Sequence, residues 1–324
     1  MPKLQDECWV ITDTAAGNQR QALALAGCLP WPARLLILEP RAPWSWLAPR
    51  LTVGGLLALP AAQRQRLTAP WPRVAIGCGR AAALFTRMLR SLSAGSCYTV
   101  QILDPRSTPD SWDTVIAPQH DQLSGPNVLQ PLGSLNPIDD AWLADGRAAY
   151  PALGELARPR VGVLLGGPRR GIPLDVDYAQ RLANQLLARQ QHNGGSLLLL
   201  GSRRTPTAVA NVFRERLRGV PGLLWCCAED GPNPYPAVLG WADQLVVTPD
   251  SVNMLSEACA VGCPVSTFVT SPLPTKLQRF HQSLHQAGLL HDLGNTAPST
   301  QAPLRETAAI AKIVLQRIAS AQAQ

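Results

Sequence analysis

The sequence predicts an α/β fold of two doubly wound, Rossmann-like domains. The chain has 324 residues with 46% hydrophobic content, which is enough for two hydrophobic cores. Short apolar runs alternate with helical stretches in both halves, as in parallel sheets covered by helices. Between residues 150 and 159 this alternation lapses and proline recurs, so we place the domain junction there. Two such domains are expected to face a cleft that can hold a ligand.

In the first half, the apolar runs indicate a series of buried strands separated by loops and helices. Buried strands are expected at residues 8–12, 33–38, 98–103, 113–117 and 127–130, and from Val74 into a glycine turn. A helix follows the first strand as far as Leu29, and another opens at residue 136. A proline- and tryptophan-rich connection around residues 44–46 separates the second and third strands.

The loop after the first strand carries a candidate catalytic base, Asp13. This carboxylate follows the carboxyl end of a strand, where an open α/β sheet places catalytic or binding groups. Gly17 permits a tight turn, and Asn18 can cap the next helix while neighbouring amides face a ligand. The alternative is that Asp13 only accepts hydrogen bonds from the loop's own amides.

His120 is the second candidate for acid–base chemistry. It follows the strand at residues 113–117 and stands beside Asp121. Histidine titrates near neutral pH, and a neighbouring carboxylate can orient the ring. The alternative is a surface histidine without a catalytic role.

The second half repeats the alternation. Strands are expected at residues 160–165, 196–200, 223–227, 245–247 and 265–269. Helices are expected at residues 175–191, 207–218, 274–286 and 303–319.

Residues 245–265 form the centre of the predicted binding site. Asp250 or Ser251 can cap the helix that follows the strand, and a helix N-terminus favours an anion such as a phosphate. Glu257 lies roughly two turns further along, where a carboxylate can accept hydrogen bonds from ribose hydroxyls. Together, these positions predict a nucleotide-sugar site. The alternative is an ordinary capped helix with Glu257 exposed to water.

Two further loops at the ends of strands suit a diphosphate. Gly166 and Gly167 can bring bare backbone close to a ligand. Ser202, Arg203 and Thr205 offer hydroxyl and guanidinium donors for phosphate oxygens.

The composition limits the classes of partner that we expect for this chain. The net charge is +7, but the arginines are scattered and no basic run interleaves with aromatic residues, so we expect no nucleic-acid partner. The charge suits anionic small molecules or an anionic membrane face. The eight cysteines show no zinc-binding spacing and are expected to be reduced thiols. No signal region or long apolar stretch is present, which predicts a cytoplasmic protein, or alternatively a membrane-peripheral one.

Several motifs together resemble a known family. They lie at residues 9–21, 76–80, 101–106, 118–121, 125–127, 202–206, 233–235 and 248–258. The chain is similar over nearly its whole length to bacterial members of the mitochondrial fission "elongated mitochondria" family, which is named for plant proteins on the mitochondrial surface. That family resembles glycosyltransferases of the GT-B fold, whose C-terminal domain holds a nucleotide sugar. The resemblance implies that Asn253 and Met254 join the binding site and that Glu257 contacts the ribose.

The combined prediction is a GT-B-like protein. Residues 1–150 are assigned to the acceptor side, residues 158–300 to the nucleotide-sugar side, and residues 303–324 to a helix that packs back on the first domain. The expected function is inverting sugar transfer from a nucleoside diphosphate sugar to an unknown acceptor, with no metal and no cofactor. The alternative is a non-catalytic scaffold for protein or membrane-surface interaction. The sequence leaves open whether the protein is an enzyme, the sugar, the base, the acceptor and the oligomeric state.

Overall fold

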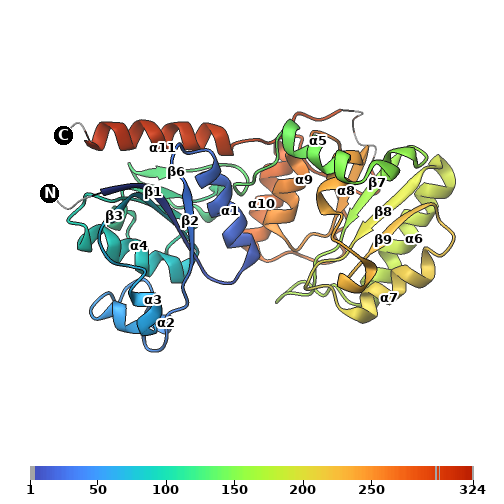
Figure 1. Ribbon diagram of the computed structural model, residues 1–324. Helices are drawn as coiled ribbons and strands as arrows, with labels where there is room; N and C mark the ends of the chain where they lie inside the picture. Colours follow the sequence, from blue (N-terminus) through green and yellow to red (C-terminus); the bar gives the residue numbers. More distant parts are fainter. Residues whose placement is uncertain (1–3, 296–297, 299, 323–324) are drawn as a thin grey trace. The chain divides into compact units, whose positions relative to one another are not determined.

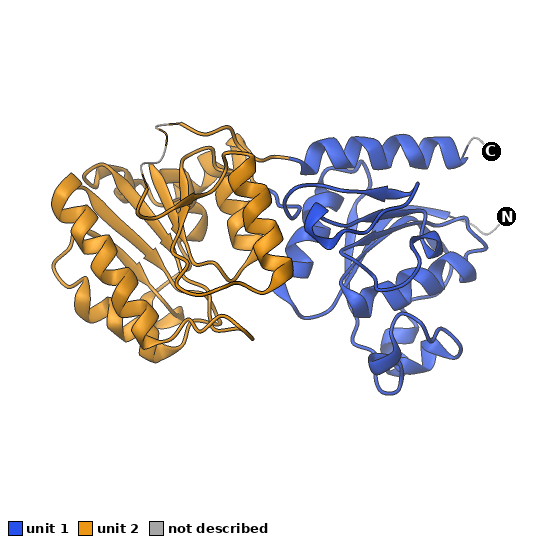
Figure 2. Ribbon diagram, turned by 180° about the vertical axis from the view of Figure 1, so that it is seen from behind, with its two compact units in different colours: residues 1–137, 306–324 blue, residues 138–305 orange. Residues whose placement is uncertain are grey.

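The computed structural model describes residues 4–295, 298 and 300–322. Chain contacts divide it into unit 1, Met1–Pro137 with Glu306–Gln324, and unit 2, Ile138–Arg305 (Figure 2). Each unit contains a six-stranded sheet in which every neighbouring pair of strands is parallel. The predicted fold class is therefore confirmed.

The sheet of unit 1 has the strand order β2-β1-β3-β4-β5-β6 (Figure 1). Its strands are β1 (Leu4–Thr12), β2 (Ala33–Ile37), β3 (Trp71–Cys78), β4 (Tyr98–Ile102), β5 (Thr114–Ile116) and β6 (Val128–Leu129). Its helices are α1 (Ala16–Gly27), α4 (Arg80–Leu92) and α11 (Thr307–Gln322), with short 3-10 turns at η2 (Pro109–Ser111) and η3 (Gln119–Asp121). The connection between β2 and β3 folds into α2 (Trp44–Leu47), η1 (Gly55–Ala58) and α3 (Ala61–Arg64).

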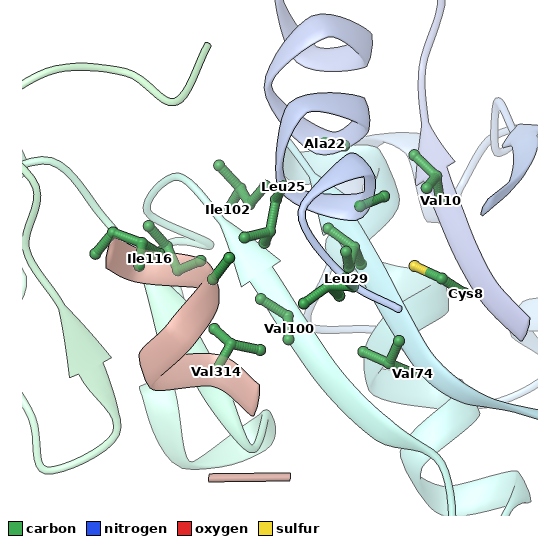
Figure 3. Packing of buried hydrophobic residues seen from close by; sticks show 14 of the residues in the cluster. Cys8, Val10, Ala22, Leu25, Leu29, Val74, Val100, Ile102, Ile116 and Val314 are labelled. Carbon is green, nitrogen blue, oxygen red and sulfur yellow. The ribbon is translucent and has the colours of Figure 1, made fainter. Parts of the chain in front are cut away.

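Alternation along β1 places a hydrophobic core on each face of this sheet. Cys8 and Val10 belong to the cluster that α1 and α11 cover, whereas Trp9 and Ile11 belong to the cluster under α4. Figure 3 shows Val314 of α11 close to residues of the central strands. The C-terminal helix therefore completes the core of unit 1, although the chain reaches it only after the whole of unit 2.

The sheet of unit 2 has the strand order β12-β11-β10-β7-β8-β9. Its strands are β7 (Arg160–Leu164), β8 (Ser196–Leu200), β9 (Gly222–Trp225), β10 (Gln244–Val247), β11 (Val265–Thr267) and β12 (His291–Asp292). Its helices are α5 (Asp140–Ala149), α6 (Val176–Asn193), α7 (Thr207–Arg216), α8 (Tyr235–Trp241), α9 (Val252–Cys259) and α10 (Thr275–Gln286), with 3-10 turns at η4 (Pro151–Glu155) and η5 (Ala228–Asp230).

Helix α5 precedes the proline-rich stretch but packs in unit 2. A side chain at Gly146 would overlap the backbone of Pro236 in α8, and one at Gly240 would overlap the backbone of Leu143. The two helices therefore approach closely through small residues, which couples α5 to unit 2 instead of to the sheet that precedes it.

The strand orders locate the point in each sheet where the direction of winding reverses. In unit 2 the chain leaves β7 for β8 and β9, then returns to the other side of β7 with β10. In unit 1 the reversal lies between β1 and β3. Ligands of open α/β sheets bind outside the carboxyl ends of the strands at this point. Among the described residues, no helix is both long and apolar enough to cross a membrane.

Candidate functional site

The glycine turn after β7 meets the loop after β10 at the reversal point of unit 2. The amide of Gly166 donates to Thr248 Oγ1 at 2.8 Å, and the amide of Gly167 donates to Asp250 Oδ2 at 3.3 Å. A Cβ at Gly166 would overlap the Asp250 carboxylate, and a Cβ at Gly167 would overlap the backbone carbonyl of Arg204. Both glycines are therefore required for the close approach of three loops.

Asp250 connects these loops from a fully buried position. Its Oδ1 accepts from Thr248 Oγ1 at 2.7 Å, and its Oδ2 pairs with Arg204 Nη2 at 2.6 Å. The carboxylate thus accepts bonds from protein donors on both oxygens. Asp250, predicted to bind the nucleotide sugar, is placed where it organises the loops around the start of α9.

Ser202 and Thr205 also bond within the protein. The Thr205 hydroxyl lies 2.6 Å from the carbonyl oxygen of Gly166 and accepts from the Ser202 amide at 2.8 Å. Ser202 Oγ accepts from the Arg204 amide at 3.2 Å. These bonds fix the β8–α7 loop beside the glycine turn, and Arg203 is exposed at its tip.

The N-terminus of α9 lies at the reversal point. Two guanidinium groups from the loops after β7 and β8, those of Arg169 and Arg204, lie close to it. Ser251 is the N-cap, and its Oγ accepts from the Met254 amide at 3.3 Å. Arg169 Nη1 donates to the Asp250 carbonyl at 2.7 Å, and the Arg204 side chain is 45% exposed. Asn253 and Met254 lie in the first turn and are half-buried. The Asp250 carboxylate offsets the charge of Arg204, so the helix dipole and the Arg169 guanidinium supply the remaining positive charge. The site is partly accessible and suited to an anion.

Glu257 lies on α9 and is buried. Its Oε2 accepts a hydrogen bond from the Tyr235 hydroxyl, which comes from the start of α8. Nearby, His281 Nε2 lies 3.0 Å from the Pro249 carbonyl oxygen in the loop that leads into α9. Burial lowers the pKa of His281 to about 4, so the ring is neutral near pH 7 and donates to this carbonyl.

In unit 1 the loops after β1 and β3 meet in the same way at the reversal point. Asp13 Oδ1 accepts from the Ala15 amide at 3.0 Å and from Asn18 Nδ2 at 2.9 Å. A Cβ at Gly79 would overlap the Asn18 amide group. Helix α1 starts at Ala16 with Ala15 at its N-cap, so Gly17 and Asn18 lie in the first turn. Asn18 therefore bonds Asp13 instead of capping the helix.

His120 lies in η3 after β5 and is buried, with its Nε2 3.6 Å from Asp121 Oδ1. The strand order separates β5 from β1 by β3 and β4. Three strand spacings put His120 and Asp13 roughly 14 Å apart along the sheet edge. Asp13 and His120 are therefore too far apart to act on the same proton. Of the two, Asp13 is the one that lies at the reversal point.

Sequence reasoning did not assign roles to Tyr235, Arg169 or Arg204. The arginines stand in the glycine-containing loops, so their residue type was a usable signal. The sequence gave no signal of the partner of Tyr235, because its hydrogen bond to Glu257 joins residues 22 positions apart in two different helices, with β10 between them in the chain.

Comparisons with known proteins identify relatives over most of the chain. A family model described as "Mitochondrial fission ELM1" matches residues 16–318. The mitochondrial fission protein ELM1 of Arabidopsis thaliana is 30% identical over 286 residues, which cover 79% of this chain and 66% of that protein, just under two thirds of its length. An uncharacterized protein of Rickettsia prowazekii is 24% identical over 302 residues, covering 80% of this chain and 82% of that protein.

Several solved structures share the fold. A UDP-N-acetylglucosamine 2-epimerase has a TM-score of 0.56 at 11% identity, covering 97% of this chain and 96% of that one. The UDP-GlcNAc 2-epimerase of Methanocaldococcus jannaschii has a TM-score of 0.54 at 12% identity, covering 96% and 99%. Os79 of O. sativa, in complex with UDP, has a TM-score of 0.52 at 13% identity, covering 97% and 94%. At these identities the likeness is one of fold, and it is the two-domain, GT-B-like fold.

Proposed function

The chain belongs to the Mitochondrial fission ELM1 family and has a GT-B-like fold. On this basis we propose that unit 2 binds a nucleoside diphosphate sugar as the donor in a glycosyl transfer. The neighbours named for UDP or UDP-GlcNAc make a uridine diphosphate the first nucleotide to try.

The observation that carries the proposal is the positive site at the start of α9. It combines a helix N-terminus, the Gly166–Gly167 turn and the guanidiniums of Arg169 and Arg204 at the reversal point of the sheet. A diphosphate needs several donors that converge on two linked anions, and bidentate guanidiniums with helix amides provide such donors.

The ribose would lie against Glu257. A carboxylate accepts bonds from vicinal hydroxyls, and the Tyr235 hydroxyl fixes its orientation from the neighbouring helix. In this proposal Tyr235 is a positioning residue, because it acts through Glu257.

The chemical step would be an inverting transfer. A base takes the proton from an acceptor hydroxyl, whose oxygen then attacks the anomeric carbon opposite the leaving diphosphate. Asp13 is the proposed base in unit 1, with His120 as the second choice. The charge that develops on the diphosphate is stabilised by the start of α9 and the two arginines, so the proposed reaction needs no metal and no cofactor.

Thermal melting with UDP tests donor binding. Ligand at about 100 times its dissociation constant stabilises the native state by roughly 2.7 kcal/mol, which raises the melting temperature by several degrees. Glu257→Ala should weaken binding by about 1 to 3 kcal/mol, whereas Glu155→Ala, an exposed glutamate of the same unit, should not change it. If millimolar UDP leaves the melting temperature of the wild-type protein unchanged, unit 2 is not a uridine diphosphate site.

The second candidate is a non-catalytic scaffold, which the name of the Arabidopsis relative favours. A panel of nucleotide sugars, with and without acceptor extracts, separates the two. Release of nucleoside diphosphate from a panel member supports the enzyme, and binding without turnover of any donor supports the scaffold.

A further inference from the structure

The connection between β2 and β3 forms a small lobe, residues 40–70, that carries unusual exposed hydrophobic residues. Four large apolar side chains are exposed: Trp46 by 74%, Leu47 by 50%, Val53 by 82% and Leu57 by 61%. Figure 1 shows α2 and α3 of this lobe on the far side of α4 from the sheet. The exposed side chains therefore lie outside the core of unit 1.

Hydrogen bonds and buried leucines fix the lobe to the rest of unit 1, so its exposed apolar side chains belong to an ordered surface. The guanidinium of Arg80, on α4, donates to the Ser45 carbonyl at 2.9 Å, and Arg87 donates to the Pro49 carbonyl at 3.1 Å. Within the lobe, Trp44 Nε1 donates to the Val53 carbonyl at 3.0 Å, which joins α2 to the loop before η1. Leu59 and Leu67 are buried in the core beneath α4.

The charge of the lobe has a single sign. Residues 40–70 contain Arg41, Arg50, Arg64 and Arg66 but no aspartate or glutamate. Arg41, Arg50 and Arg66 are exposed. The lobe therefore presents exposed tryptophan, leucine and valine together with exposed arginines, and it contains no acidic residue of its own. This combination complements a surface that is apolar inside and anionic outside.

We propose that the lobe docks unit 1 on an anionic lipid bilayer. Tryptophan is suited to the headgroup level of a membrane, where its ring is buried and its indole N–H stays hydrated. Leu47, Val53 and Leu57 would enter the acyl boundary, and the arginines would contact lipid phosphates. A peripheral contact of this kind needs no spanning helix. The proposal is independent of the donor site in unit 2.

Flotation of the full chain with vesicles tests the proposal. The protein should float with vesicles of equal parts phosphatidylglycerol and phosphatidylcholine, float poorly with phosphatidylcholine alone, and detach as salt rises. Arg41→Gln with Arg50→Gln should weaken binding about 30-fold, because each basic residue near an anionic surface contributes about a factor of five. Trp46→Ser with Leu47→Ser should weaken it at least tenfold on both vesicle types.

Matched variants outside the lobe serve as controls. Arg181→Gln with Arg218→Gln removes the same charge from exposed positions of unit 2, and Leu92→Ser removes an apolar side chain that is 44% exposed on α4. Both should float like the wild type. All variants should keep the wild-type melting temperature and UDP response, since the lobe substitutions are at exposed sites.

Three results would overturn the proposal. These are failure of the wild type to float with anionic vesicles, equal loss of flotation in the lobe and control variants, and wild-type flotation of the lobe variants. A protein that self-associates through the lobe, with a smaller oligomer for Trp46→Ser and no flotation, would show that a second copy is the occupant instead.

Discussion

The Asp13 carboxylate is half-buried, and both of its shorter hydrogen bonds go to one oxygen, Oδ1. Its Oδ2 accepts the longer hydrogen bond, of 3.1 Å, from Asn18 Nδ2. An asparagine can keep both Oδ1 bonds with its carbonyl oxygen. The base function can therefore be removed at this position without loss of the loop.

Asp13→Asn should abolish transfer while donor binding stays intact, because an amide cannot take the acceptor's proton. The assay is release of nucleoside diphosphate from a donor that the wild type uses, together with the melting shift that UDP produces. Retained turnover in this variant would remove Asp13 as the base and direct attention to His120→Gln. Loss of the UDP shift would instead show a structural effect of the substitution.

His281 gives unit 2 a pH dependence. The folded protein lowers its pKa to about 4, whereas the unfolded chain keeps the ordinary value near 6.5. Below pH 6.5 the unfolded state binds a proton that the folded state does not, so stability falls with pH down to about 4. At pH 5 the loss relative to pH 7 should be about 2 kcal/mol.

Denaturant unfolding at the two pH values measures this loss. His281→Gln removes the titrating ring and should flatten this part of the pH profile. The control is His192→Gln, at an exposed position near the end of α6, which should leave the profile unchanged. An identical profile for His281→Gln and the wild type would show that another group causes the acid sensitivity.

At the scale of elements, the Gly166–Gly167 turn depends on backbone contact between three loops. Gly167→Ala would press a Cβ against the Arg204 carbonyl, which is backbone and cannot rotate away. We expect a loss of roughly 1 to 3 kcal/mol in unfolding free energy, as for other steric clashes in tightly packed sites, and a weaker UDP response. Gly27→Ala at the end of α1 is the control, since a Cβ there meets no atom within 4 Å.

Urea unfolding and UDP melting curves measure both effects. A fully stable Gly167→Ala protein that binds UDP like the wild type would contradict the role given to this turn. A destabilised Gly27→Ala protein would show that glycine-to-alanine changes are costly here for a different reason.

The elements themselves were largely predictable. Strand β8 (Ser196–Leu200) coincides with the predicted apolar run, and β7 and β4 begin at the predicted residues. These strands have neighbours on both sides in their sheets and are mostly buried. Strand β8 is apolar from Leu197 to Leu200, as expected for a strand covered on both faces, whereas β4 includes the buried polar residues Thr99 and Gln101. The two-residue β12 was not predicted, because it lies at the sheet edge and its residues, His291 and Asp292, have no strand pattern.

The sequence predicted which loops form the candidate site, but it did not predict which side chains in those loops bond to one another. A loop at the carboxyl end of a strand is visible in sequence, which is why the Gly166, Ser202 and Ser251 loops could be named. The burial of Asp250 and the bond between Tyr235 and Glu257 depend on how loops and helices pack. Local periodicity carries no information about such contacts. The same limit explains why the residues of α5 gave no sign that they pack on α8.

At the scale of the whole molecule, two surfaces with different chemistry are proposed on one chain of net charge +7. One is a compact anion site on unit 2 that uses arginines tied to Asp250. The other is an apolar lobe on unit 1 whose arginines have no acidic neighbour in residues 40–70. The excess of positive charge therefore fits two kinds of anion, a nucleoside diphosphate and a lipid headgroup.

We propose above all that the start of α9 holds a nucleoside diphosphate, and a crystal structure of the full chain grown with UDP would show whether it does. We expect diphosphate oxygens within hydrogen-bond distance of the first-turn amides of α9 and of Arg169 or Arg204, with the ribose hydroxyls on Glu257. UDP bound elsewhere on the chain, or a vacant α9 terminus at saturating UDP, would rule out this donor site.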